Sequence, residues 1–205
     1  MSSINAIIFD IGNVLLRFDF NLALQKLARD SDSAAEAINA LLEPIKVAYE
    51  AGRMTRADFQ AEARAILRYT GSDADFVSAW EDIFTENEPM MDLVRRLHGR
   101  LPLYLLSNTN DMHVDFILRR YPVFGLFTDA VYSYKVGASK PEREIYEIAA
   151  RQFGVKPEET LFIDDLLANI ESARAVGFRA HHYHHERHEA LLGELAAMDL
   201  TTREV

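Results

Sequence analysis

Short apolar runs without polar alternation recur along this chain and limit its fold more than any other feature of the sequence. The clearest lie at residues 6–9, 103–106 and 160–163, with a weaker run at 130–132. Runs of this length and composition are typical of strands buried on both faces of a parallel sheet. A fifth run, 178–183, is more polar, so we expect it at an edge of the sheet.

Amphipathic helices are predicted between these runs. Pro89 opens one apolar stripe that ends at Gly99, and Pro141 and Gly154 bound another in the same way. Proline in the first turn and glycine just past the last turn are common helix boundaries. Strands that alternate with helices predict an α/β fold with a Rossmann-like parallel sheet.

The stretch 18–88 interrupts this alternation, because it holds helical stripes without a convincing strand. One of these stripes is formed by Phe76, Trp80, Ile83 and Phe84. An insertion after the first strand would lie above the carboxyl ends of the strands, where ligands bind in open α/β sheets. We therefore predict a small all-helical cap over 18–88 on a core of 1–17 and 89–205. Helices packed against the side of the sheet are the alternative.

Composition narrows the classes of function. The 205 residues include no cysteine, which excludes disulfides, thiolate metal sites and cysteine nucleophiles. The 32 acidic against 22 basic residues give a net charge of -10, which opposes binding to nucleic acid phosphates. No apolar run approaches the roughly 18 residues that cross a membrane, and the N-terminus lacks signal-peptide features. We expect a cytoplasmic monomer or homodimer that binds neither nucleic acid nor membrane.

Polar side chains follow each central strand of the predicted sheet. They are Asp10 after the first strand, Ser107 and Asn108 after the second, and Asp164 and Asp165 after the last. Any one of them could be a turn residue or a helix cap. Because the carboxyl ends of parallel strands share one edge of the sheet, we expect all of them to converge on one site.

The chemistry of these residues suits a phosphoryl dianion. Asp10 and Asp165 are hard oxygen ligands of the kind that Mg²⁺ prefers. Ser107 Oγ, the backbone N–H of Asn108 and the Lys140 ammonium would hold phosphoryl oxygens and stabilise charge in the transition state. The Asp10 carboxylate could then attack phosphorus and form an aspartyl-phosphate that water cleaves.

Four segments together resemble the motifs of the haloacid dehalogenase (HAD) superfamily. They are FDIGNVLL around Asp10, LLSNTN around Ser107, ASKPEREIY around Lys140 and LFIDDLLANI around Asp165. They occur in that superfamily's order, and the helical insertion stands where it places its type 1 cap. The resemblance extends from Ile4 to about Gly177. It is greatest to small helical-capped phosphatases with an Asp-x-Gly-Asn first motif, such as bacterial glucose-1-phosphate phosphatases.

This resemblance implies Mg²⁺-dependent hydrolysis of a phosphate monoester with Asp10 as nucleophile. It also implies that Asp10, the Gly12 carbonyl and Asp165 hold the metal. Asp164 and Asn169 are expected just behind these ligands, where Asp164 would orient the motif lysine or a metal-bound water. The expected substrate is a small phosphorylated metabolite of the sugar phosphate kind.

Gly12 departs from the superfamily pattern, in which a second aspartate usually stands at this position as general acid and base. General acid–base catalysis is typically worth ~10²–10⁴ in rate, so its loss must be compensated. We favour a substrate with a good leaving group, such as an anomeric hydroxyl or an acyl group. A cap residue or bound water that supplies the proton, or a slow protein that chiefly binds, are the alternatives.

Two other functions fit the same scaffold. One is a 2-haloacid dehalogenase, in which Asp10 would attack carbon and no metal is needed. The adjacent Asp164 and Asp165 argue against it, because without Mg²⁺ they would repel a carboxylate substrate. The other is a weakly catalytic member that binds phosphate or a protein partner through its cap, which Gly12 would favour.

Overall fold

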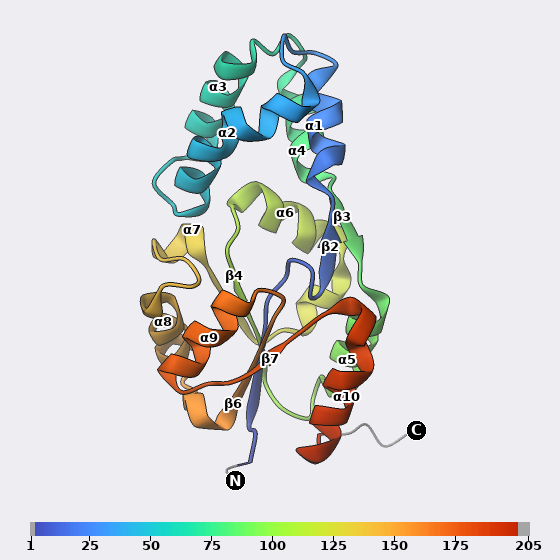
Figure 1. Ribbon diagram of the computed structural model, residues 1–205, viewed down its shortest axis with the longest axis vertical. Helices are drawn as coiled ribbons and strands as arrows, with labels where there is room; N and C mark the ends of the chain where they lie inside the picture. Colours follow the sequence, from blue (N-terminus) through green and yellow to red (C-terminus); the bar gives the residue numbers. More distant parts are fainter. Residues whose placement is uncertain (1–2, 201–205) are drawn as a thin grey trace.

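A five-stranded parallel sheet forms the centre of the molecule, in the order β5-β4-β1-β6-β7 (Figure 1). The computed structural model describes residues 3–200. The strands are β1 (Ala6–Phe9), β4 (Leu103–Ser107), β5 (Asp129–Tyr132), β6 (Thr160–Asp164) and β7 (Arg179–His182). Every predicted run is a strand, and the polar fifth run is an edge strand, as expected. The predicted α/β fold with a Rossmann-like sheet and a helical insertion is confirmed.

Helices cover both faces of the sheet, because successive side chains of each strand point to opposite sides. In β1, Ile7 and Phe9 belong to one apolar cluster and Ala6 and Ile8 to the other, and all four are buried. The first cluster includes α5 (Glu88–Leu97), α6 (Asp111–Arg120) and α10 (His188–Ala197). The second includes α8 (Arg143–Phe153) and α9 (Leu167–Val176). Across residues 3–200, no helix combines the length and apolarity that a bilayer crossing requires.

Four helices stand above the carboxyl ends of the strands and form the cap (Figure 1). They are α1 (Phe20–Ala28), α2 (Ala35–Glu50), α3 (Arg56–Leu67) and α4 (Asp73–Glu81). Phe59, Phe76 and Trp80 are completely buried in an apolar cluster of their own. The side chains of Thr55 and Ser72 cap the N-termini of α3 and α4, which satisfies backbone donors that a helix start leaves unpaired.

A short antiparallel ribbon joins the cap to the sheet, formed by β2 (Leu16–Phe18) and β3 (Phe84–Glu86). The expectation of no strand in this stretch, with Phe84 on a helical stripe, is therefore wrong. α4 ends at Glu81, and Phe84 pairs with Phe18 and packs against the sheet's core cluster rather than inside the cap. Three-residue strands carry too little periodicity to read, and their pairing depends on residues remote in the chain.

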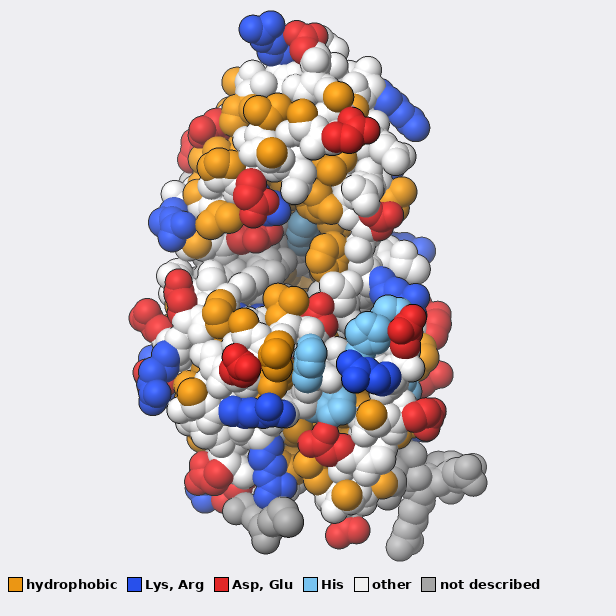
Figure 2. Space-filling view, viewed as in Figure 1, with side chains coloured by type: hydrophobic (Ala, Val, Ile, Leu, Met, Phe, Trp, Pro, Cys, Tyr) orange, Lys and Arg blue, Asp and Glu red, His pale blue; other side chains and the backbone are white. Residues whose placement is uncertain are grey.

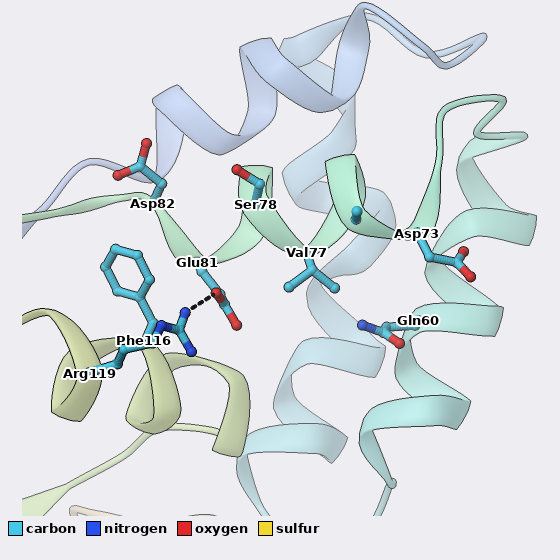
Figure 3. Close-up of a pocket in the computed structure, with 9 residues that line it drawn as sticks. Gln60, Asp73, Val77, Ser78, Glu81, Asp82, Phe116 and Arg119 are labelled. Carbon is cyan, nitrogen blue, oxygen red and sulfur yellow. Dashed lines mark hydrogen bonds and ion pairs between the residues drawn. The ribbon is translucent and has the colours of Figure 1, made fainter.

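Helix α6 ties the cap to the core through ion pairs. Arg56 of α3 lies 3.0 Å from Asp111 and 2.5 Å from Asp115 of α6. Arg119 of α6 reaches Glu81 of α4 at 3.1 Å, across a surface hollow between the two helices (Figure 3). These ion pairs hold two cap helices, α3 and α4, against the core.

The remaining elements are short. Helix α7 (Ser133–Val136) follows β5 directly and contacts α2 of the cap. Three 3₁₀ turns complete the described chain: η1 (Pro122–Leu126), η2 (Pro157–Glu159) and η3 (His185–Arg187). α7 matters for the site, because it brings the core up to the C-terminal end of α2.

Candidate active site

Asp10 is the first residue after β1 and is buried at the carboxyl edge of the sheet. Its backbone N–H donates to the carbonyl of Ile163 at 2.9 Å, and its Oδ1 lies 2.8 Å from Lys140 Nζ. Burial raises the pKa of the Asp10 carboxyl, Lys140 lowers it and Asp164 raises it again, with a net upward shift. The carboxylate therefore depends on nearby positive charge to stay ionised.

Lys140 lies between two carboxylates, 2.8 Å from Asp10 and 2.6 Å from Asp164. Burial alone would lower the pKa of this ammonium, but the two carboxylates outweigh burial and the net shift is upward. The Asn108 side chain holds the lysine backbone, since its Nδ2 donates to the Lys140 carbonyl and its Oδ1 accepts from the Lys140 N–H, both at 2.8 Å. Sequence reasoning used only the backbone of Asn108 and missed this second contact.

Asp164 is completely buried and both of its oxygens accept hydrogen bonds. Oδ1 accepts from the Leu166 N–H at 2.8 Å and from Asn169 Nδ2 at 2.9 Å. Oδ2 accepts from Lys140 Nζ at 2.6 Å and from Asn169 Nδ2 at 3.1 Å. These contacts leave Asp164 and Asn169 behind the lysine, in a geometry suited to orienting its ammonium.

Asp165 is half-buried, and its Oδ2 accepts a hydrogen bond from Asn13 Nδ2 at 3.1 Å. Burial raises the pKa of Asp165, and the hydrogen bond from Asn13 offsets part of that rise. Sequence reasoning placed Asn13 just after the first strand, in the Asp-x-Gly-Asn motif, but gave it no role in the site. Its positive φ of 53° is a conformation that asparagine tolerates better than most residues.

The three acids form a candidate cation site. Asp10, Asp164 and Asp165 each offer a carboxylate oxygen, and these oxygens lie within 4.8 Å of one another. Carboxylates are the donors that Mg²⁺ prefers, and it needs only one or two of them with water and phosphate. Three carboxylates meet a single ammonium here, so a divalent cation would relieve their mutual repulsion. The donor set therefore fits Mg²⁺.

A cavity of about 190 Å³ opens onto these groups. Every residue predicted for the site lines it except Asp164; the predicted residues that do are Asp10, Gly12, Ser107, Asn108, Lys140, Asp165 and Asn169. Phe18, which sequence reasoning missed, also lines the cavity. A Cβ added at Gly12 would lie 3.2 Å from Phe18 Cε1, so an aromatic ring fills the space beside this glycine.

A larger cavity of about 400 Å³ continues under the cap and shares Gly12, Phe18, Ser107 and Asn108 with the first. The space-filling view shows the molecule hollowed between cap and core (Figure 2). The other residues that line this larger cavity are Ile11, Phe20, Asn39, Lys46, Glu50, Ile83, Phe84, Thr109, His113 and Ile117. Sequence reasoning assigned none of them a role in the site. Six of them, Phe20, Asn39, Lys46, Glu50, Ile83 and Phe84, belong to the inserted stretch 18–88, which carries no readable motif.

Comparison with known families agrees with this geometry. Residues 4–177 match the haloacid dehalogenase-like hydrolases. The chain belongs to this family. The match includes every residue of the site described above, and this hydrolase thus carries the acid cluster and the buried lysine within its family region.

Known proteins similar to this hydrolase include a D-ribitol-5-phosphate phosphatase of Bacteroides thetaiotaomicron, 27% identical over 85% of this chain and 89% of the relative. A HAD family enzyme from that organism, solved with magnesium and inorganic phosphate, is 26% identical with a TM-score of 0.76, covering 87% of this chain and 93% of the other. An L-2-haloacid dehalogenase of Xanthobacter autotrophicus has a TM-score of 0.65 at 20% identity, covering 98% and 84%. This last likeness shows the fold alone.

Proposed function

We propose that this hydrolase is a Mg²⁺-dependent phosphatase that cleaves a small phosphate monoester through an aspartyl-phosphate on Asp10. The observation that carries the proposal is the meeting of Asp10, Lys140 and the acid cluster at one cavity on the carboxyl edge of the sheet. A dehalogenase would need no such cluster, and its carboxylate substrate would be repelled by it. The phosphate complex of the magnesium-bound relative supports the same assignment.

Different residues of the chain have different roles in the proposed reaction. Mg²⁺, when bound by Asp10, the Gly12 carbonyl and Asp165, supplies positive charge that offsets the carboxylates and the phosphoryl dianion. Lys140 Nζ, Ser107 Oγ and the Asn108 N–H hold phosphoryl oxygens and stabilise the charge that develops on them. The Asp10 carboxylate attacks phosphorus, and water then cleaves the resulting acyl phosphate.

The residues that line the larger cavity support the proposal that the substrate is polyhydroxylated, such as a sugar or polyol phosphate. It offers the rings of Phe18 and Phe20 beside the polar side chains of Asn39, Lys46 and Glu50. A few placed polar groups among apolar walls are what orient a small ligand. The similarity to a D-ribitol-5-phosphate phosphatase points to the same class.

A screen tests this function. We expect phosphate release from one or more of a panel of sugar and polyol monophosphates when Mg²⁺ is present. EDTA should abolish the release and excess Mg²⁺ should restore it. Asp10→Asn should remove it completely while circular dichroism shows an unchanged fold. Turnover without metal, or chloride release from 2-chloropropionate in EDTA, would contradict the proposal.

A further inference from the structure

We propose that Glu50, the last residue of α2, is the general acid and base of this hydrolase, in the role that Gly12 cannot fill. The inference rests on the proposed phosphatase function. Gly12 has no side chain to carry a proton, and the ring of Phe18 occupies the space beside it. The group that transfers the proton must then come from elsewhere around the larger cavity under the cap, where the leaving group would lie. Glu50 lines that cavity together with Gly12, Ser107 and Asn108.

The backbone of Glu50 is anchored to the core beside the loop that follows β4. Its carbonyl accepts a hydrogen bond from Ser133 Oγ at 2.5 Å, and the same Oγ accepts from the Thr109 N–H at 2.9 Å. One hydroxyl group thus joins the end of α2 to Thr109, two residues after Ser107 at the end of β4. Gly52 reinforces the contact, because a Cβ there would lie 2.3 Å from the Tyr134 carbonyl oxygen. Glu50 is therefore held at the site by the core as well as by the cap.

Within the described part of the chain, the Glu50 carboxyl makes no hydrogen bond and no ion pair. Burial raises its pKa from 4.5 to about 7, while Lys46 lowers it and Glu43 raises it, both from the same helix. The core presents the neutral Ser133 and Thr109 at the same point. The carboxyl can therefore give and take a proton near neutral pH, where general acid–base catalysis is most efficient.

The other titratable groups of this cavity are already engaged. Both ring nitrogens of His113 are within 3.1 Å of partners, Nε2 of the Trp80 carbonyl and Nδ1 of Asn110 Nδ2. Burial lowers the pKa of His113 to about 4, so the ring is neutral at pH 7. The Lys46 ammonium pairs with Glu43 at 2.5 Å and lies 5.3 Å over the Phe20 ring. Glu50 is the group left free to exchange a proton with substrate.

The proton balances across both steps. In the first, an Asp10 oxygen bonds to phosphorus, the bond from phosphorus to the leaving oxygen breaks, and the Glu50 carboxyl gives its proton to that oxygen. In the second, water bonds to phosphorus as its proton passes to the Glu50 carboxylate. The bond from phosphorus to Asp10 then breaks and phosphate leaves. Glu50 ends protonated, as it began.

A pair of aryl phosphates tests this role with Mg²⁺ present. Phenyl phosphate has a poor leaving group that needs a proton, whereas the more acidic p-nitrophenol leaves without one. The variants are Glu50→Gln, Glu50→Asp and, as a matched control, Glu36→Gln, which removes an exposed carboxylate from the first turn of the same helix. The measurements are kcat/KM for both esters from pH 5 to 9, pre-steady-state p-nitrophenol release, and the melting temperature of each variant.

We expect Glu50→Gln to lower kcat/KM for phenyl phosphate by ~10²–10³ and for p-nitrophenyl phosphate by less than ~5-fold. The wild-type decline for phenyl phosphate above about pH 7 should vanish in this variant. A burst of p-nitrophenol should appear, because the base for the second step is lost. Glu50→Asp should restore part of the phenyl phosphate rate, and Glu36→Gln should match wild type.

Equal losses for the two esters, or no loss, would overturn the role of Glu50 while leaving the phosphatase function intact. The ratio of the two esters also separates catalysis from misfolding, since a partly unfolded variant loses activity on both alike. A wild-type protein inactive on every phosphate ester with Mg²⁺ would overturn the proposed function, and the inference with it.

Discussion

Two ionisable side chains near the site, Lys140 and Glu50, differ in how their burial is compensated. Lys140 is buried with carboxylates at 2.8 and 2.6 Å, so its charge is balanced where it lies. Glu50 is partly buried, and among residues 3–200 its carboxyl has no hydrogen-bond or ion-pair partner. A buried carboxylate without a partner favours its protonated form and destabilises the fold when it ionises. Such groups persist where function requires them.

Replacing Glu50 by the isosteric, uncharged glutamine should therefore stabilise the protein at high pH. The folded pKa of about 7 exceeds the ordinary 4.5, so the folded state holds the proton more tightly. Glu50 therefore makes its full contribution to the free energy of unfolding below pH 4.5, where it is protonated, and this contribution is lost as the pH rises through 7. We expect the free energy of unfolding of Glu50→Gln to exceed that of wild type by up to about 3 kcal/mol at pH 8, less any screening by solvent. Near pH 4.5 the two free energies should be equal.

Urea unfolding at the two pH values measures this difference. Glu36→Gln, which removes an exposed carboxylate from the same helix, is the control variant. Equal stability of Glu50→Gln and wild type at pH 8 would show that the Glu50 carboxylate ionises in the fold without cost.

Helix α2 serves both the cap core and the active-site cavity. Its apolar stripe, formed by Ile38, Leu42, Ile45 and Tyr49, packs inside the cap. Asn39, Lys46 and Glu50 share another face, since their spacings of seven and four residues correspond to whole turns, and they line the cavity. A shift of α2 would therefore change the cavity, which makes the docking of its C-terminal end on α7 important.

Gly52 tests this docking, with Gly99 as a matched control. Both glycines have positive φ, 69° and 77°, but an added Cβ would lie 2.3 Å from the Tyr134 carbonyl at Gly52 and in open space at Gly99. Gly99→Ala should cost about 1–2 kcal/mol of unfolding free energy, from backbone strain alone. Gly52→Ala should cost more and also displace the end of α2.

The displacement has its own signature in the aryl phosphate assay. Gly52→Ala should lower kcat/KM for phenyl phosphate more than for p-nitrophenyl phosphate, because Glu50 moves away from the leaving oxygen. Gly99→Ala should leave the ratio of the two unchanged. Identical behaviour of the two variants in both assays would mean that this contact does not position α2.

Over the whole molecule, net charge and local charge at the site have different consequences. The net charge of -10 repels anions in general, yet the site proposed here takes a phosphate dianion. Lys140 alone does not reverse the sign, since Asp10, Asp164 and Asp165 surround it. A divalent cation held by these acids would make the cavity attractive to phosphate, because a bound ion is the largest charge in such a site.

Binding of Mg²⁺ should accordingly stabilise the whole fold. A ligand that binds only the folded state adds about 2.7 kcal/mol at a hundred times its Kd. We expect the wild-type melting temperature to rise with Mg²⁺ concentration and to fall back in EDTA. Asp165→Asn should melt no lower than wild type without metal, because it removes a repelled carboxylate, but should lose the Mg²⁺ response. Glu36→Gln should keep it; an Mg²⁺ response that survives Asp165→Asn would place the cation elsewhere.

The sequence by itself determined the sheet and the edge at which the chemistry gathers. Buried parallel strands are apolar along their whole length, so the runs 6–9, 103–106 and 160–163 could be recognised locally. The polar residues that follow them had to meet, because parallel strands end at one edge. Asp10, Ser107 and Asp165 line one cavity for that reason, and Lys140, from the loop between α7 and α8, joins them there.

Only the tertiary structure decided what surrounds those residues. Three contacts each join residues remote in the chain: the pairing of β2 with β3, the hydrogen bonds of the Asn108 side chain to Lys140, and the placement of Glu50 beside Thr109 in the loop after β4. No local pattern encodes such contacts, since each depends on how the cap packs against the sheet. A glutamate at the end of an amphipathic helix is an ordinary surface residue in sequence. Among residues 3–200 the Glu50 carboxyl has no partner, and its burial in the tertiary structure raises its pKa.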